Sequence, residues 1–291
     1  MADNKLIIYL KERFPAPLAI FYSVIFAFCN VVFTKKRLSA PGYLWPFIFI
    51  SAIFFLFFLR LRLTDEIKDY KYDMINHPER PIAKGLIKIS TIKKILFFVL
   101  LAEVTIIFFT NVATAAIYFL ILIYSWLMYK DFYLKKFMDK HLLLMLLLHQ
   151  FIFLSYTWLA IAILAVNIAP TAACANFFIL MFTGPLLFEL GRKLEHRKNA
   201  NGQETNDTYV YSWGSAKTFG MIVLVALAEA FALLFLTRAG SRSFILIYFI
   251  LLLAIVIYYL LKKQQAVQAS KYWSIALAIA GQLIYILANG L

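Results

Sequence analysis

Long apolar runs constrain the fold of this chain more than any other feature of its sequence. A bilayer core about 30 Å thick is crossed by about 20 apolar residues in a helix. Continuous runs favour helices, and the alternating segments of about 10 residues that form membrane β-barrels are absent. The sequence therefore predicts an all-α, polytopic membrane helical bundle with about nine transmembrane helices. The nine candidate spans are residues 17–34, 44–60, 94–110, 112–129, 141–163, 171–188, 218–237, 243–261 and 272–290.

The composition agrees with a membrane protein. Of the 291 residues, 63% are hydrophobic and 15% are charged, and the mean hydropathy is +0.80. These values lie outside the range of soluble globular domains. Cys29 and Cys174 both lie in apolar runs, which favours a packing role over a disulfide framework or a zinc site. The first residues lack a short apolar core followed by a small-residue cleavage site, so we expect no removable signal peptide.

The basic residues indicate how the spans are oriented. With the N-terminus in the cytoplasm, 24 of the 29 Lys and Arg residues fall in connections on that side, as the positive-inside rule requires. We therefore expect an integral protein of a bacterial-type inner membrane or plasma membrane, with its N-terminus and polar connections cytoplasmic. The net charge of +14 then reflects topology and attraction to anionic lipid, with no nucleic-acid partner.

Four carboxylates lie within nine residues of the connection between the second and third spans. On a helix at 100° per residue, the last three fall within about 60° of one another, and the first lies at the edge of that face. One interpretation is a solvated helix end that Lys68 and Lys71 partly neutralise. The other is a magnesium site, because hard oxygen ligands suit this ion. The four residues are Asp65, Glu66, Asp69 and Asp73.

Proline ends the acidic helix and cationic groups follow it. His77-Pro78 and Arg80-Pro81 are backbone stops, because a residue before proline is pushed out of the helical region. The acidic helix is therefore expected to end near Asn76. Arg80 and Lys84 lie beyond it, near Gly85.

Two further cytoplasmic connections carry unusual polar residues. The segment from Tyr124 to Lys136 is typical of an interfacial belt, in which Trp and Tyr lie at headgroup depth and Lys reaches toward water. In the next connection, Glu189 directly follows a span and Arg192 lies one turn later. This second pattern fits either a helix-end ion pair with a solvated loop or a role in handling phosphate.

Carboxylates with flanking Arg and Lys provide what diphosphate chemistry requires. Carboxylates hold magnesium, and magnesium with the cationic side chains neutralises the phosphate oxygens as the leaving diphosphate develops charge. A substrate for such a site on apolar helices has a charged head and a long apolar tail. An isoprenyl diphosphate fits this description.

These motifs resemble the UbiA superfamily of intramembrane prenyltransferases. Its members are nine-helix bundles with acidic motifs after the second and sixth helices, and the first motif reads Asn-Asp-x-x-Asp-x-x-x-Asp. This chain has Asp65-Glu66-x-x-Asp69-x-x-x-Asp73. Carboxylate chemistry survives the two changes, so the resemblance implies that these four residues bind Mg2+. It also implies one domain over residues 1–291, with a first acidic cytoplasmic loop at 61–93 and a second motif loop at 189–217.

The resemblance also assigns the cationic residues. The family's Arg-Pro and Gly correspond to Arg80-Pro81 and Gly85, with a slightly shorter spacer, and its Tyr-Pro-x-x-Lys-Arg segment loosely matches the sequence that ends at Lys130. Asp69, Asp73, Arg80 and Lys130 are then the catalytic residues. The residues implied to bind the diphosphate are Arg80, Lys84, Lys130, Arg192 and Lys193.

The second acidic motif departs from the family pattern. The usual form is Asp-x-x-x-Asp, whereas this chain has Glu189-x-x-x-Lys193, with Asp207 further on. Two readings stay open. Either Glu189, with Glu195 or Asp207, supplies metal ligands, or Arg192 and Lys193 replace the metal's charge by contacting phosphate directly.

The leading hypothesis is transfer of a prenyl group from a prenyl diphosphate to an acceptor inside a water-excluding bundle. Candidate acceptors are aromatic acids, quinone precursors, glycerol phosphate and sugar phosphates. Glu103 and Glu229 stand within apolar spans, where each is either a protonated or paired packing residue or a base near the acceptor.

Three rival functions are weighed against this hypothesis. A terpene cyclase of the same superfamily would use the same metal site without an acceptor. A CDP-alcohol phosphatidyltransferase is disfavoured because its Asp-Gly and Ala-Arg elements are absent. A non-catalytic lipid or ion carrier would explain the altered second motif.

Overall fold

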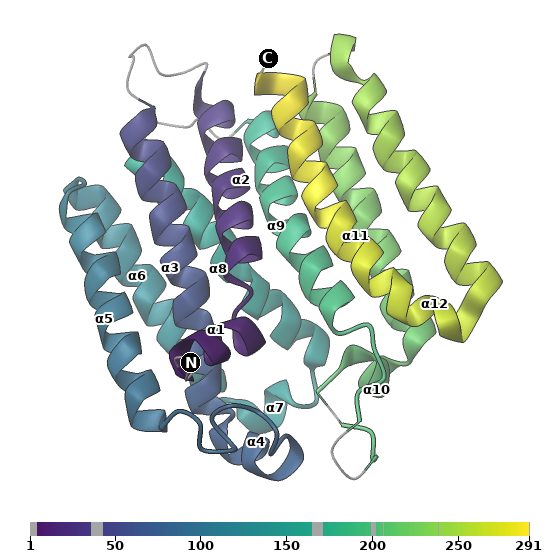
Figure 1. The fold of residues 1–291 in the computed structure, drawn as a ribbon. Helices are drawn as coiled ribbons and strands as arrows, with labels where there is room; N and C mark the ends of the chain where they lie inside the picture. Colours follow the sequence, from purple (N-terminus) through teal and green to yellow (C-terminus); the bar gives the residue numbers. More distant parts are fainter. Residues whose placement is uncertain are drawn as a thin grey trace. The chain divides into compact units, whose positions relative to one another are not determined.

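The computed structural model describes residues 5–35, 43–164, 171–198, 202–205, 207–237 and 239–290, and Figure 1 shows their fold. Side chains are described for all of these except residues 239 and 262–271. Residues 199–201 and 206, which belong to the predicted second motif loop, lie outside the described residues. Across the described ranges, β pairing is confined to one isolated bridge between Lys198 and Glu204. The predicted all-α class is confirmed.

The chain forms two compact units. The first contains Met1–Val31 and Leu38–Ala165, and the second contains Val32–Arg37 and Val166–Leu291. The prediction of one domain over residues 1–291 stays a prediction. The helices from the N-terminus to the end of the first unit are α1 (Lys5–Arg13), α2 (Ala16–Thr34), α3 (Leu44–Lys68), α4 (Tyr70–Asn76), α5 (Ile89–Phe108), α6 (Val112–Tyr129), η2 (Asp131–Tyr133), α7 (Lys135–Met138) and α8 (Leu142–Ile163). The remaining helices are α9 (Ala172–Arg192), α10 (Tyr209–Trp213), α11 (Ser215–Leu236), η3 (Ala239–Ser241) and α12 (Ser243–Gly290).

Eight helical segments in the described residues are long and apolar enough to cross a membrane. They coincide with eight of the nine predicted spans, and they indicate an integral membrane protein. The ninth predicted span, residues 94–110, corresponds to α5, which ends at Phe108. Every stretch of α5 long enough to cross a membrane contains Lys93, Lys94 and Glu103, so α5 carries more charge than the eight candidate spans.

The last two predicted spans belong to one helix. Helix α12 continues from Ser243 to Gly290 without a break in its assignment, although a connection was expected at residues 262–271. That segment contains neither proline nor glycine, so the chain stays helical through the connection in which it reverses direction (Figure 1). Figure 1 shows α12 as two arms that run side by side, with the turn between them at the lower end. Each arm contains a candidate span, Ser243–Leu261 and Tyr272–Gly290.

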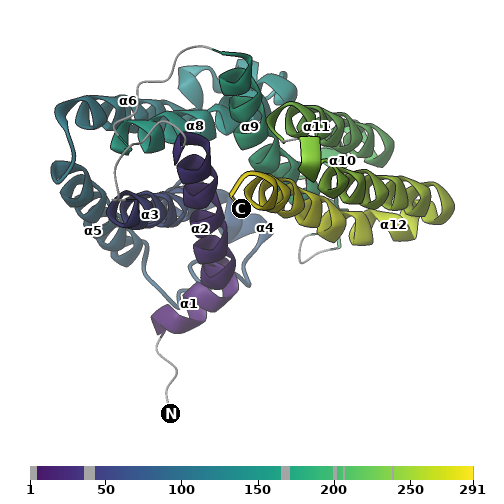
Figure 2. The same cartoon turned by 90° about the horizontal axis from the view of Figure 1, so that it is seen from above.

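Aromatic rings fill the core of the first unit. Figure 2 shows α3 between α2 and α5. Phe54 of α3 is fully buried and stacks on Phe26 of α2, with ring centroids 3.7 Å apart. On the same helix, Phe57 stacks on Tyr156 of α8 at 4.1 Å. Such pairs add about 0.5–1.5 kcal/mol each beyond burial, so α3 is anchored on two sides.

In the second unit, α9 packs against both α11 and α12. Phe177, Leu180 and Met181 of α9 are fully buried. Phe219 of α11 stacks on Tyr259 of α12, with centroids 3.7 Å apart. The start of α9 is fixed by Thr171, whose side chain accepts a hydrogen bond from the backbone N–H of Cys174. The end of α9 carries Glu189, so this packing positions the second polar cluster.

Candidate active site

The predicted acidic helix is present but bends at its centre. Helix α3 ends at Lys68 and α4 begins at Tyr70, so Asp69 lies at the junction. Its backbone N–H still donates to the carbonyl of Asp65 at 2.8 Å, which keeps the two helices nearly continuous. Helix α4 ends at Asn76, as the following proline predicted.

Glu66 is buried and paired with two arginines. Its residue surface is 3% exposed. Nε of Arg13 donates to its Oε1 at 2.8 Å, and Arg62, one turn earlier on α3, forms an ion pair with the same oxygen. The position predicted as a metal ligand is therefore occupied by guanidinium contacts.

Asp73 lies in the same cluster. It is 4% exposed, and its carboxylate is paired with Arg80, the residue that follows the first proline turn. Arg13 also reaches it, with Nη2 3.6 Å from Oδ2. The structure therefore brings Arg80 to the acidic motif, as expected for a shared site. Arg13 bridges two of its carboxylates.

Asp69 and Asp65 are the exposed members of the acidic motif. Reduced hydration raises the pKa of Asp69 to about 6, and the carboxylates of Asp65 and Asp73 raise it in the same direction. Asp69 keeps an exposed surface and stands beside these two further carboxylates. They mark a local excess of negative charge.

The arginines of the same cluster bring positive charges close together. Burial lowers the pKa of Arg13, and the positive charges of Arg62 and Arg80 lower it further, while Glu66 acts in the other direction. A region that crowds cations therefore adjoins one that crowds carboxylates. A metal-bound phosphate would provide a cation for the carboxylates and an anion for the guanidinium groups.

No group of three His, Cys, Asp or Glu side chains within the described ranges is arranged to hold a metal ion. The donor chemistry nevertheless fits magnesium, which is often bound through one or two carboxylates together with substrate phosphates. Asp65 and Asp69 are exposed and one helical turn apart, so they offer such a pair. Glu66 and Asp73 are engaged by arginines instead.

The segment after α6 is joined to the acidic motif by a salt bridge. Nζ of Lys68 lies 2.5 Å from Oδ1 of Asp131. Asp131, Phe132 and Tyr133 all have positive φ angles, of 48°, 54° and 59°, a conformation that costs non-glycine residues energy. The adjacent Lys130 is exposed, and its Nζ lies 5.0 Å from the ring centroid of Tyr129. The interfacial-belt reading and the diphosphate role of Lys130 both stay predictions.

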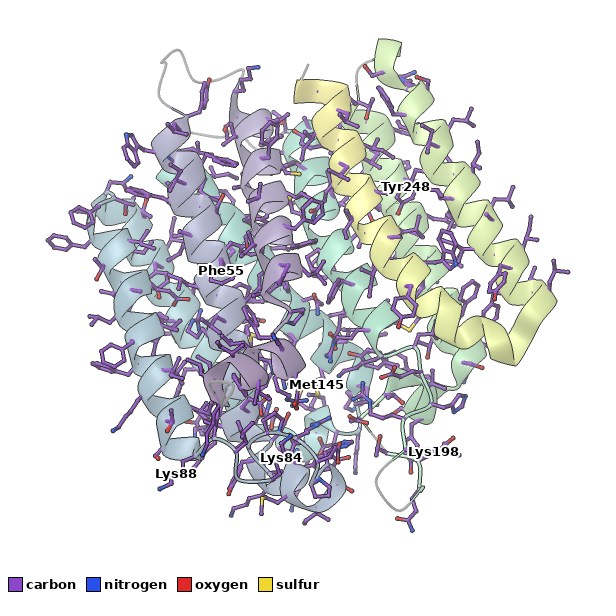
Figure 3. All side chains as sticks on the ribbon, in the orientation of Figure 1. Phe55, Lys84, Lys88, Met145, Lys198 and Tyr248 are labelled. Carbon is purple, nitrogen blue, oxygen red and sulfur yellow. The ribbon has the colours of Figure 1, made fainter. Side chains whose placement is uncertain are left out.

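Lys84 lies beside α1 rather than against the carboxylates. Its Nζ is 3.7 Å from Oε1 of Glu12, and both side chains are exposed. Figure 3 shows Lys84 and Lys88 near the same end of the first unit. Both lysines are exposed, and Lys84 is paired with Glu12.

In the second unit, Glu189 forms a helix-end ion pair with Arg192, which was one of the two alternatives for this motif, and a second ion pair with Lys193. Nη2 of Arg192 lies 2.9 Å from its Oε2, and Nζ of Lys193 lies 3.2 Å from its Oε1. Lys193 also faces the ring of Tyr209, with Nζ 4.9 Å from the centroid. Burial, followed by the charge of Glu189, raises the pKa of Tyr209.

Asp207 belongs to a different set of contacts. Nη1 of Arg197 lies 2.5 Å from its Oδ2, and the hydroxyl of Thr205 donates to its Oδ1. Arg197 is also paired with Glu195. Although burial opposes it, bonding to these two carboxylates raises the pKa of Arg197. Glu189 and Asp207 are thus held by different cations.

The intramembrane acids are held by polar partners. Glu103 forms a salt bridge with Arg60 and accepts a hydrogen bond from Tyr118, so the paired reading is confirmed for it. Glu229 accepts a hydrogen bond of 3.1 Å from Tyr248. Figure 3 labels Tyr248 on the first arm of α12.

Sequence reasoning missed Arg13, Arg62 and Asp131. Arg62 precedes Glu66 by four residues, so helical spacing alone could have placed it on the acidic face. Arg13 is 53 residues from Glu66, and Asp131 is 63 residues from Lys68. No local pattern could have indicated those two contacts.

The fold and the polar cluster define a polytopic membrane protein with an acidic and basic centre at the end of a helical bundle. The sequence model of the UbiA prenyltransferase family matches residues 23–280. The chain therefore belongs to the UbiA prenyltransferase family. It also matches a solved structure of digeranylgeranylglyceryl phosphate synthase, with a TM-score of 0.61 and 15% sequence identity over 98% of each chain. No curated protein matches the chain in sequence.

Proposed function

We propose that this chain is a magnesium-dependent intramembrane prenyltransferase that moves a prenyl group from a prenyl diphosphate to a small or lipid acceptor. Membership of the UbiA family supports the reaction class. The observation that carries the proposal is the meeting of Arg13, Arg62 and Arg80 with the carboxylates of the first acidic motif. This centre provides both cation-binding and phosphate-binding groups.

The reaction needs the bond between C1 of the prenyl chain and the diphosphate oxygen to break. The diphosphate leaves with the electron pair, the acceptor forms a new bond to C1, and the acceptor atom loses its proton. Mg2+ bound to Asp65 and Asp69 would neutralise charge on the leaving diphosphate. Arg80 and Lys130 would donate to its oxygens, and the apolar helices would exclude the water that otherwise hydrolyses the chain.

The second polar cluster enters the proposal through its cations. Glu189 is already bonded by Arg192 and Lys193, which fits direct phosphate contact by these cations better than a second metal. Asp207 is likewise engaged by Arg197. The same proposal places the acidic loop in the cytoplasm, because the connections on that side carry most of the Lys and Arg residues.

The test is an assay of purified protein in lipid nanodiscs with prenyl diphosphates of several lengths. Each is offered with Mg2+ and with aromatic-acid, glycerol-phosphate, sugar-phosphate or quinone-precursor acceptors, and the lipid products are identified by mass spectrometry. Glycerol phosphate is included among the acceptors because the similar solved structure is named as a digeranylgeranylglyceryl phosphate synthase. We expect a prenylated acceptor and release of diphosphate, both abolished by EDTA.

Matched variants separate the rival functions. Asp69→Asn should reduce turnover by at least a hundredfold, whereas Glu79→Gln removes an exposed acid from the same loop and should leave it unchanged. A cyclic hydrocarbon formed from the diphosphate alone would show a cyclase instead. Binding of diphosphate without any turnover would show a carrier.

A further inference from the structure

Helix α1 lies across the end of the first candidate span instead of continuing it. Only Phe14 and Pro15 separate α1 from α2, and a residue before proline is pushed out of the helical region. Figure 1 shows α1 crossing beneath the lower end of α2, and Figure 2 shows it bent away from that helix. Because α2 is long and apolar enough to cross a membrane, a helix that bends away at its end runs along the membrane surface.

The packing of α1 fixes its place on the first unit. Tyr9 is fully buried in an apolar cluster that includes Leu63 of α3 and Ile92 of α5. Leu10, the next residue of α1, is half-buried against the same cluster. Helix α1 therefore lies beside the first turn of α5 and the last turns of α3.

The exposed side chains of α5 indicate the depth of this contact in the membrane. Lys93 and Lys94, which follow Ile92, are exposed. About one turn later, the rings of Phe97 and Phe98 are 62% and 64% exposed. Lysines near the end of a membrane helix reach the headgroups, whereas exposed apolar rings face lipid. Helix α1, which packs at Ile92, therefore lies at the level of the headgroups.

The outer surface of α1 combines apolar and basic side chains. Leu6 and Ile7 are large and apolar, yet they are 38% and 48% exposed. At 100° per residue, Leu6, Leu10 and Ile7 fall within an arc of about 100°. Lys11 lies just beyond Ile7 on the helix surface, and both Lys11 and Lys5 are exposed. An apolar stripe with adjacent lysines is typical of helices that lie in the membrane interface.

We propose that α1 is an interfacial helix that binds an anionic lipid surface. Leu6 and Ile7 enter the boundary between headgroups and acyl chains, and Lys5 and Lys11 contact the lipid phosphates. Charge complementarity identifies the partner, because anionic lipids give a membrane surface a negative potential that attracts basic segments beside a span. Helix α1 directly precedes such a span. This role is separate from the proposed function, because it uses no residue of the candidate active site.

Nitroxide labels on the full chain in nanodiscs test this inference, because oxygen reaches a label in lipid and a water-soluble nickel complex reaches a label in water. Cys29 and Cys174 are buried, so they should not take the label. Ile7→Cys is the test position. Glu79→Cys is the aqueous reference, because the Glu79 side chain is 66% exposed in the first acidic loop.

The nanodiscs contain phosphatidylcholine and phosphatidylglycerol. The nickel complex should reach the label at Ile7→Cys several-fold less than the label at Glu79→Cys, because an interfacial helix buries its apolar face about 5–10 Å deep. Equal access to both labels would place α1 in water and overturn the inference. Exclusion of both oxygen and nickel from Ile7→Cys would show a protein contact, such as a second copy of the chain, and would overturn it too. If Ile7→Cys does not fold, Leu6→Cys decides by the same comparison.

The charge of the lipid distinguishes an anionic partner from any bilayer. Nickel access at Ile7→Cys should rise in nanodiscs of phosphatidylcholine alone, and Lys5→Gln with Lys11→Gln should produce the same rise in the anionic nanodiscs. Lys136→Gln with Lys140→Gln is the matched control, because it removes the same charge from exposed positions at and beside α7. It should leave the access unchanged. A rise in this control, or no response to lipid charge or to the α1 lysines, would overturn the assignment to anionic lipid.

Discussion

Nε of Arg60 lies 2.9 Å from Oε2 of Glu103, between α3 and α5, and both side chains are buried. Tyr118 of α6 donates to Glu103 at 2.5 Å, and Arg60 donates to the hydroxyl of Tyr156 on α8 at 2.8 Å. One connected polar network thus joins four helices of the first unit. In a membrane segment, each of these groups needs its partner because no water replaces it.

Glu103→Leu should destabilise the protein by about 3–5 kcal/mol, because it leaves the Arg60 charge buried without a counter-ion. Replacing both partners, as Arg60→Met with Glu103→Leu, should recover most of that loss. Denaturant unfolding in a mild detergent measures both variants. A double variant no more stable than Glu103→Leu alone would contradict the pairing argument.

Gly281→Ala should destabilise the second unit, because an added Cβ would lie 2.0 Å from Oε1 of Glu229. Both groups are buried, so the carboxyl has little room to move. The expected loss is about 1–3 kcal/mol. Thermal unfolding in detergent measures it.

The control is a double-mutant cycle with Glu229→Ala, which removes the carboxyl that the new methyl group meets. The alanine at 281 should cost much less in that background, so the two effects should not add. Additive losses would mean that the added methyl group acts on something other than Glu229.

The turn after α6 provides a test of backbone strain. Tyr133 is exposed and has a φ of 59°. Asparagine tolerates this conformation, whereas a β-branched residue does not. Tyr133→Val should therefore be less stable than Tyr133→Asn by about 1–3 kcal/mol. Both lose the ring contact with Trp126, so their difference reports mainly the backbone preference, and equal stabilities would show that the turn relaxes.

Lys68→Met should loosen the same turn, because Lys68 is bonded to Asp131 at its start. We expect a lower kcat with an unchanged protein fold if this salt bridge aligns Lys130 for the reaction. Hydrogen exchange of residues 130–134 should rise in parallel. Faster exchange with full activity would show that Lys130 needs no such alignment.

The sequence predicted the helices well because apolar runs and proline stops are local signals. The end of α4 at Asn76 and the pairing of Glu189 with Arg192 both follow from spacing along one helix. The bend at Asp69 and the left-handed turn at Asp131 carry no comparable pattern. They depend on contacts such as Lys68 with Asp131, whose partners are far apart in the sequence.

In the acidic motif, too, the sequence indicated the local features but not the contacts between distant residues. Its composition indicated a cluster of carboxylates, and Arg80 was found through the family's Arg-Pro pattern. That Glu66 and Asp73 are paired with guanidinium groups was not predictable, because Arg13 arrives from α1. The charges of the motif could be counted from the sequence, but how they are shared could not.

The cations beside Glu189 provide the last prediction, which decides between the two readings of the second motif. Glu189 accepts from both Arg192 and Lys193. If those cations hold phosphate, Arg192→Gln should raise the KM for the prenyl diphosphate about tenfold. Glu189→Gln should lower this KM, because it releases both cations, and should leave the magnesium dependence unchanged.

A metal ligand at position 189 makes the opposite prediction. Glu189→Gln would then require a higher Mg2+ concentration for half-maximal activity and would lose turnover, because an amide replaces a charged oxygen ligand. Steady-state kinetics over a grid of Mg2+ and diphosphate concentrations separates the two results. Glu204→Gln, which removes an exposed acid from the same connection, is the control for a general change in charge and should leave both parameters unaltered. A shift in the magnesium requirement confined to Glu189→Gln would overturn the phosphate reading.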